Sequence, residues 1–563
     1  MKTLLYGGKI VNVFTDSLEN ADVLMEDDVI TGVGSYSPSD ADNAVDVTGK
    51  ILCPGFVDGH IHIESTMLLP GELARTSLPH GTTCIVADPH EIANVCGTDG
   101  LRYMIQSSEG LPMEILFALP SCVPATPVDE AGAVLDAAAL RPFYNEPRVV
   151  ALGELMNYPG LLAGDLDIYA KIRDARDAGR TVNGHAPLLT GHGLDQYIAA
   201  GVSDDHECTT ADEAMERLRK GQWVMIRQGT AARDLIPLLP LFEEPYNRRC
   251  LLVTDDRHPA DLLRSGHIDD IIRTAVQNGK SPLTGIRMAS LQAAQCFGLR
   301  RQGAIAPGWR ADVLVLDDLD TVHVQAVYTK GQLVAENGAA LPFKMPPVDA
   351  ELTGRVTHSM HTDAFTPEQF FIEPKGEKCR VIHLLPGQLL TEEEQLNVNW
   401  KQNNGIDTER DLLKLAVAER HHHTGHIGLG FLHGLGLPRG AIASTVSHDA
   451  HNLIIVGTRD DDMAFAANTV REMGGGSAVV ADGKVLARLP LPIAGLMSPE
   501  NAETVAEQNR LLRQAVIDLG AHGALECFMA TAFVSLPVIP HIKMTTYGPV
   551  HVDTQKLIPL FVD

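Results

Sequence analysis

The chain has 563 residues, of which 45% are hydrophobic and 21% charged, a balance typical of a folded globular protein that excludes a disordered or fibrous chain. The formal net charge of −27 leaves no basic surplus to neutralise phosphates, so we expect neither a nucleic-acid partner nor an anionic membrane partner. Because single cores stop growing at about 250 to 300 residues, the length predicts several domains.

The nine cysteines are scattered along the chain and include no CxxC pair, which argues against a disulfide framework and against a structural zinc ribbon. The first residues lack the pattern of a signal peptide. No stretch reaches the roughly 18 to 20 apolar residues that a membrane-spanning helix needs. We therefore expect a cytoplasmic protein.

Two distant segments, residues 1–52 and 303–340, consist of short β-forming runs separated by glycine and Asp/Asn turns. Their similarity predicts one composite β-sandwich domain that is interrupted by a long insertion. In the insertion, residues 53–302, short apolar strands alternate with helical stretches such as residues 166–179. This alternation predicts an α/β fold, a TIM-like (β/α)₈ barrel, although an open doubly wound sheet would give a similar rhythm. The residues described below predict that this barrel is the catalytic, metal-binding domain.

The last third of the chain predicts a connector followed by a further domain. Residues 341–378 are rich in proline, threonine and aspartate and indicate the connector. Residues 379–563 predict a separate C-terminal α+β domain, with a helix at 409–420, a strand at 452–457 and a helix at 463–475.

The run Asp58-Gly59-His60-Ile61-His62 is the first candidate for chemistry. His60 and His62 alternate along a strand, so both side chains leave the same face and can bind one metal ion. The run ends the first predicted barrel strand, and catalytic groups gather at that end of the barrel. An isolated HxH pair is weak evidence by itself, because two exposed histidines also occur by chance.

Further polar residues each follow a short apolar run and so stand at the mouth of a strand: Glu154, His185, His206 and Asp255. With the two histidines they provide the nitrogen and oxygen ligands that suit two divalent ions bridged by a carboxylate and a hydroxide. Taken singly, His185 is more typical of a polar surface residue, and Glu154 could pair with an arginine. Asp256 is as plausible a ligand as Asp255 on composition.

The ordered pattern of HxH, Glu, His, His and Asp resembles the binuclear branch of the amidohydrolase superfamily. The strings DGHIHIESTML, ADPHEIANV, GELMNYPG, NGHAP, DDHECT and TDDRHP resemble the adenine deaminase family, and the similarity covers essentially the whole chain. The resemblance implies one ion on His60, His62 and Asp255 and a second ion on His185 and His206. It implies Glu154 as the bridge, where many relatives carry a carboxylated lysine, and it favours Asp255 over Asp256.

The resemblance also implies the reaction, hydrolysis of adenine to hypoxanthine and ammonia for purine salvage, through attack of a metal-bridging hydroxide on carbon 6 of the purine. Asp255 would take the proton and pass it to the leaving amine. Ring nitrogen 1 then needs a donor, for which Glu207, His90 and Asp88 are candidates that would also bind the purine. Imidazole and carboxylate ligands without thiolate suit Fe(II), Mn(II) or Zn(II), and the resemblance implies Fe(II) or Mn(II) as the more typical ions.

Two other readings of the same residues stay open. A cyclic-amide hydrolase of the dihydroorotase or hydantoinase kind would share the metal site. A non-catalytic scaffold is disfavoured, because all the expected ligand residues are present. By analogy with the family we expect a homodimer or a higher homo-oligomer that acts on a small purine base.

Two histidine-rich patches lie in the C-terminal region. Residues 420–423 with His426 are interpreted as a structural or surface run. The segment that contains His448, Asp449 and His451 resembles a recurring string of the family's C-terminal domain. Its polar groups predict a role facing the active site or an additional metal ion, and the alternative is a hydrogen-bonded turn.

Overall fold

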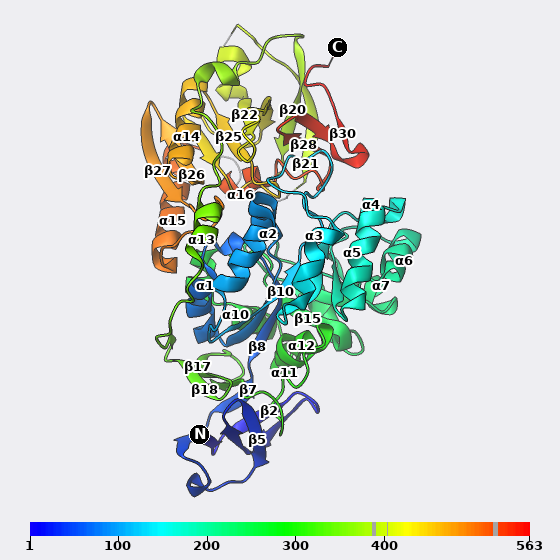
Figure 1. Ribbon diagram of the computed structural model, residues 1–563, viewed down its shortest axis with the longest axis vertical. Coiled ribbons are helices and arrows are strands. Elements are labelled where there is room, and N and C mark those ends of the chain that lie inside the picture. Colours follow the sequence, from blue (N-terminus) through cyan, green and yellow to red (C-terminus); the bar gives the residue numbers. More distant parts are fainter. Residues whose placement is uncertain (386–389, 402, 522–526, 563) are drawn as a thin grey trace.

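The computed structural model describes residues 1–385, 390–401, 403–521 and 527–562. The described chain forms three stacked parts, which are a β region that contains the N-terminus, an α/β barrel in the middle and a C-terminal domain at the other end (Figure 1). Within these described ranges, no helix combines the length and the apolar character needed to cross a membrane.

The β region consists of two sheets. One sheet has the order β5-β4-β1-β6 and contains β1 (Lys2–Tyr6), β4 (Asp22–Glu26), β5 (Val29–Gly34) and β6 (Asn43–Asp46). The other has the order β19-β18-β17-β16-β7-β2-β3 and contains β2 (Lys9–Asn12), β3 (Ser17–Asn20), β7 (Ile51–Pro54), β16 (Val313–Leu316), β17 (Val324–Thr329), β18 (Gln332–Glu336) and β19 (Ala339–Ala340). Strand β16 pairs antiparallel with β7, so segments from both sides of the barrel share one sheet.

Within residues 1–385, eight parallel strands follow one another around the barrel: β8 (Phe56–Ile61), β9 (Thr82–Ala87), β10 (Glu114–Leu119), β11 (Val149–Leu155), β12 (Thr181–Gly184), β13 (Asp204–Asp205), β14 (Trp223–Arg227) and β15 (Cys250–Val253). The ring closes where the Asp255 backbone N–H donates to the His60 carbonyl at 2.9 Å and the His62 N–H donates to the Asp255 carbonyl at 3.2 Å. This closure confirms the TIM-like barrel and excludes an open doubly wound sheet, which has two free edges.

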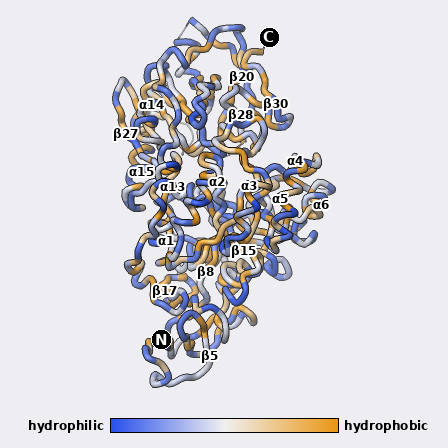
Figure 2. The backbone as a smooth tube through the Cα atoms, viewed as in Figure 1, coloured by the Kyte–Doolittle hydropathy of each residue, from blue (hydrophilic) through white to orange (hydrophobic). Residues whose placement is uncertain are grey.

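Helices follow the barrel strands along the chain: α1 (Pro70–Ser77), α2 (His90–Ser107), α3 (Ala137–Leu140), α4 (Tyr158–Ala163), α5 (Leu166–Asp177), α6 (Gly191–Ala200), α7 (Ala211–Arg219), α8 (Leu235–Leu238), α9 (Pro259–Ser265), α10 (Ile268–Gln277), α11 (Pro282–Arg287) and α12 (Ala293–Cys296). Every residue of β8, β9 and β15 is buried, because side chains fill the barrel interior and helices cover its outside. Hydrophobic residues accordingly concentrate along the barrel strands (Figure 2).

The described part of the C-terminal domain contains an eight-stranded sheet of order β21-β20-β23-β22-β25-β24-β26-β27. Its strands are β20 (Lys378–Leu384), β21 (Thr391–Asn397), β22 (Leu413–Ala418), β23 (Ile427–His433), β24 (Ala441–Ser444), β25 (Leu453–Gly457), β26 (Gly476–Ala481) and β27 (Lys484–Pro490). The other elements are α13 (Ala350–Thr357) in the connector, α14 (Asp460–Glu472), α15 (Ala502–Asp518), α16 (Cys527–Ala532) and a small sheet of β28 (Ile542–Thr545), β29 (Gly548–His551) and β30 (Lys556–Leu557).

The predicted helix at 409–420 is wrong, because its apolar part forms strand β22. Every residue of Leu413–Ala418 is buried, and β22 lies between β23 and β25 in the sheet. A short run that is apolar on both faces is compatible with a buried strand as well as with a helix, so long-range pairing decided the outcome. The predicted strand at 452–457 and the predicted helix at 463–475 are confirmed as β25 and α14.

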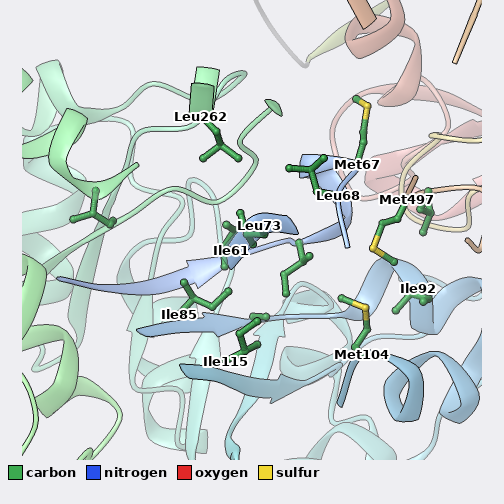
Figure 3. Close-up of a cluster of buried hydrophobic side chains, with 14 of the residues drawn as sticks. Ile61, Met67, Leu68, Leu73, Ile85, Ile92, Met104, Ile115, Leu262 and Met497 are labelled. Atoms are coloured by element: carbon green, nitrogen blue, oxygen red, sulfur yellow. The ribbon is translucent and has the colours of Figure 1, made fainter. Parts of the chain in front are cut away.

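The barrel and the C-terminal domain share one hydrophobic core. Met497 of the C-terminal domain lies beside Leu68 and Ile92 of the barrel (Figure 3). The backbone is joined at the same place, since the Ser498 N–H donates to the Met67 carbonyl at 2.9 Å. The loop after β8 and the start of α2 belong to the mouth of the barrel, so this contact brings the C-terminal domain against that mouth.

Candidate active site

His60, His62 and Asp255 lie together where β8 meets β15. The Nε2 atoms of His60 and His62 are 3.4 and 3.1 Å from Asp255 Oδ1, and all three side chains are buried. Asp58 lies beneath them and accepts the backbone N–H groups of His60 and Thr254, each at 3.2 Å. Burial raises the pKa of Asp58 to about 7. Asp58 thus ties the first and last strands together directly below the histidine pair.

Glu154, at the end of β11, stands between two sets of histidines. Its Oε1 is 3.3 Å from His62 Nε2, whereas its Oε2 is 2.6 Å from His185 Nδ1 and 3.1 Å from His206 Nε2. Burial by itself would raise the pKa of Glu154, but His185 and its neighbours outweigh burial and hold the pKa well below the usual value. Glu154 is therefore a carboxylate with one oxygen toward each set, as a bridging ligand requires.

The residues brought together here fit divalent metal ions. Two groups, His60–His62–Asp255 and His60–Glu154–His206, have ligand atoms that all lie within 4.8 Å of one another. His60 Nε2, which faces the cluster, is buried without a hydrogen-bond partner among the described residues, an arrangement that costs free energy unless another group satisfies it. Imidazole and carboxylate ligands without thiolate suit first-row divalent ions.

The structure places Asp88 behind Glu154. Asp88 Oδ2 accepts the Glu154 backbone N–H at 2.8 Å, and the Asp88 carbonyl is 3.0 Å from His62 Nδ1. Gly153 makes room for this contact, because a Cβ at that position would lie 2.1 Å from Asp88 Oδ2. These contacts favour a positioning role for Asp88 over direct contact with a substrate.

His90, the first residue of α2, lies at the edge of the metal-ligand cluster. Its Nδ1 is 3.4 Å from Glu154 Oε1 and 3.6 Å from Asp88 Oδ1. Burial lowers the pKa of His90, but the carboxylates of Asp449 and Asp88 outweigh burial and raise the pKa well above the usual value. His90 is therefore a basic imidazole held between carboxylates at the edge of the cluster.

Glu207 is ion-paired with Arg227, a residue that the sequence analysis did not single out. The guanidinium contacts both oxygens of Glu207, and its Nη1 is also 3.0 Å from Asp255 Oδ2. Burial would raise the pKa of Glu207, but Arg227 outweighs it and lowers the pKa, which makes Glu207 a poor proton donor. The one signal in the sequence was an arginine at the end of the apolar run WVMIRQG.

Replacement of Arg227 with methionine tests this pairing. Methionine keeps much of the side-chain volume but leaves Glu207 and Asp255 without their cation, so we expect kcat to fall by about 10- to 100-fold, as is typical for groups that orient metal ligands. Steady-state kinetics with metal analysis measures the effect. An unchanged kcat at full metal content would show that Arg227 does not support the site.

The segment with His448, Asp449 and His451 faces the start of α2. His451 Nε2 is 3.6 Å from Glu91 Oε2, and Asp449 Oδ1 is 3.9 Å from His90 Nε2. The Ser447 N–H donates to His451 Nδ1 at 3.2 Å, so a neutral His451 carries its proton on Nε2, directed toward Glu91. Glu91, His448 and His451 offer ligand atoms that all lie within 4.8 Å of one another, and His451 Nε2 and Glu91 Oε2 have no hydrogen-bond partner among the described residues, so the segment faces α2 with groups able to hold an additional metal ion.

The neighbouring histidine-rich run has structural contacts. Arg420 is buried and donates from Nη1 to the Ser359 carbonyl and from Nη2 to the Ala494 carbonyl, at 2.9 and 2.8 Å. His421 Nε2 lies 2.7 Å from the Ala450 carbonyl. These contacts hold the segment of His448 and His451 in place and agree with the structural interpretation of the run.

Comparison with known proteins agrees with this site. Residues 51–334 match the model of the amidohydrolase family, and residues 388–556 match the adenine deaminase C-terminal domain. The fold and the histidine–carboxylate centre are those of a metal-dependent hydrolase of the amidohydrolase family.

Similar proteins identify the branch of the amidohydrolase family. The chain is 46% identical over 559 residues to an adenine deaminase of Desulfatibacillum aliphaticivorans, covering 99% of this chain and 97% of the relative. It is 46% identical to adenine deaminase 2 of Carboxydothermus hydrogenoformans, covering 99% and 96%, and 45% identical to the adenine deaminase of Brucella suis, covering 99% and 94%. The chain belongs to the adenine deaminase family.

Proposed function

We propose that this protein is an adenine deaminase that hydrolyses adenine to hypoxanthine and ammonia. The proposal rests on the position of Glu154, whose two carboxylate oxygens face two different sets of histidines. It also rests on the family, whose members similar to this chain are named adenine deaminases. We propose that His60, His62 and Asp255 hold one divalent ion, that His185 and His206 hold the other and that Glu154 bridges them. Fe(II) and Mn(II) are our first choices for the ions, with Zn(II) as the alternative.

The bound ions would lower the pKa of a water molecule toward neutrality and so supply hydroxide at pH 7. We assign the proton transfer to Asp255. Burial would raise its pKa, but Arg227 and the two histidines outweigh burial and hold the pKa well below the usual value, so Asp255 is ionised and a proton that it takes is readily passed on. Arg227 holds Oδ2, and Oδ1 faces the cluster.

In the reaction, the oxygen of water forms a bond to carbon 6 while the bond from carbon 6 to the exocyclic nitrogen breaks. Of the two protons of the water, one is taken up by ring nitrogen 1 and the other passes through Asp255 to the exocyclic nitrogen, which leaves as ammonia. Ring nitrogen 1 needs a hydrogen-bond donor. Asp88 is held behind Glu154 and Glu207 is paired with Arg227, so we assign this role to His90.

A direct assay tests the proposal. Protein loaded with Mn(II) or Fe(II) is expected to convert adenine to hypoxanthine, followed by ultraviolet absorbance, with release of one ammonia for each hypoxanthine. Dihydroorotate and hydantoin serve as comparison substrates, because a cyclic-amide hydrolase would share the metal site. Turnover of either compound with no turnover of adenine would overturn the proposal.

We also propose what kind of molecule the enzyme binds and in which compartment of the cell it works. A small purine base requires no basic surface, which is consistent with the net charge of −27. The scattered spacing of the cysteines is typical of a reducing compartment, and we therefore place the enzyme in the cytoplasm.

A further inference from the structure

A cavity lies between the barrel and the C-terminal domain. On the barrel side it is lined by residues that include Ser65 and Asp256, and on the side of the C-terminal domain by residues that include Val446, His448 and Phe533. The cavity therefore exists only because the two domains pack together. None of the residues to which we assign metal ions lines it.

The polar end of the cavity adjoins the metal-ligand cluster. Asp256 directly follows Asp255, and Ser65 lies in the loop directly after β8. The Ser65 hydroxyl is 2.5 Å from Asp256 Oδ1 and 2.9 Å from Glu91 Oε1, so these groups form one hydrogen-bonded cluster. A molecule in the cavity would therefore have hydrogen-bonding groups beside it, one of which, Asp256, is the chain neighbour of the proposed ligand Asp255.

The opposite wall is aromatic. The rings of His448 and Phe533 are stacked, with centroids 4.4 Å apart and an angle of 13° between their planes. His448 Nδ1 is 3.9 Å from Glu91 Oε1, which is too far for a hydrogen bond, so no hydrogen bond to Glu91 fixes this ring beside its stacking on Phe533. Flat aromatic surface with a few convergent polar groups is typical of a site for a heteroaromatic ligand.

We propose that the C-terminal domain supplies one wall of the substrate site, in which the stacked His448 and Phe533 contact the purine ring while Ser65 and Asp256 meet its polar edge. The inference rests on the proposed function, because it takes the purine base as the occupant. The hydroxyl and the carboxylate can accept hydrogen bonds from the ring N–H of the imidazole half of the purine. The aromatic wall is a binding surface and leaves the chemistry to the barrel.

The test is Phe533→Leu in the metal-loaded full chain, with His448→Gln as a second variant in case the first fails to fold. Loss of one contact between a base and an aromatic ring is expected to raise the KM for adenine and the Kd for hypoxanthine by about tenfold. In Phe533→Leu we expect kcat to stay within about twofold and the metal content to be unchanged, because phenylalanine cannot bind a metal ion; the metal content of His448→Gln is measured on the same sample, because His448 lies in a group of possible ligands with Glu91 and His451. Calorimetric titration with hypoxanthine measures binding independently of turnover.

Phe365→Leu is the matched control. Phe365, in the connector, is also buried against the C-terminal domain and stacks on Phe370, with centroids 6.2 Å apart, but it does not line the cavity. We expect it to leave KM and Kd unchanged. An unchanged hypoxanthine Kd in folded Phe533→Leu and His448→Gln would overturn the inference while adenine turnover by the wild type upheld the proposed function. If both variants bound hypoxanthine more weakly but neither they nor the wild type turned over adenine, the inference about the aromatic wall would stand and the proposed deaminase function would be wrong.

Discussion

Replacement of Glu154 with alanine is expected to abolish metal binding and deaminase activity together. Glu154 has one oxygen toward His62 and the other toward His185 and His206, so its loss removes the proposed ligand common to both ions. Metal ions supply several kcal/mol of transition-state stabilisation, and kcat/KM should fall by about 10³-fold or more. Elemental analysis of the purified variant and steady-state kinetics measure the two losses.

Two further variants are compared with Glu154→Ala, one that changes a surface glutamate and one that changes a residue behind Glu154. Glu216→Ala changes a glutamate on helix α7 that pairs with Lys220 on the surface, and we expect full metal content and full rate. Asp88→Ala removes the acceptor of the Glu154 backbone N–H while sparing every proposed ligand, so we expect the ions to be retained and activity to fall. A Glu154→Ala protein with two ions and full rate would show that the bridge is assigned wrongly.

Replacement of Asp255 with asparagine is expected to separate metal binding from proton transfer. The amide oxygen can still face the ions, but the side chain can no longer accept a proton, so kcat should fall by about 10²- to 10⁴-fold, the range of general acid–base catalysis. Metal content should fall far less than in Glu154→Ala. The measurement is kcat of protein whose metal content has been determined on the same sample.

Asp256→Asn discriminates between the two neighbouring carboxylates. Asp256 bonds to Ser65 at the edge of the cavity, so this variant should keep its metals and most of its kcat and bind adenine more weakly. If instead Asp256→Asn lost its metal ions and Asp255→Asn did not, the ligand assignment at β15 would be reversed.

The barrel and the family were predictable because their signals are local. The alternation of strand and helix is visible in the sequence, and polar residues such as His185 stand directly after apolar runs. In a parallel barrel all such strand ends meet at one mouth, so position along the chain was enough to predict that these side chains converge. Whether the strands form a closed barrel or an open sheet was decided only by the backbone hydrogen bonds between β8 and the residues that follow β15.

The roles of residues around the cluster were not predictable in this way. Glu207 was a candidate proton donor until the structure placed Arg227, which is 20 positions away along the chain, against it. Asp88 was a candidate for purine binding, and the structure shows it accepting a hydrogen bond from a backbone group 66 positions away. A protonation state depends on such neighbours, which spacing along the chain does not contain.

By itself, the sequence determined the fold class, through the alternation of strands and helices, and the family, through the strings that it shares with adenine deaminases, and it supplied candidate metal ligands at the strand ends. Only the tertiary structure decided that Leu413–Ala418 is a strand, that Arg227 supports the site and that the C-terminal domain adjoins the barrel mouth. The physical reason is that these features arise from packing between segments far apart in the chain, where burial and the charge of a distant neighbour outweigh local preference.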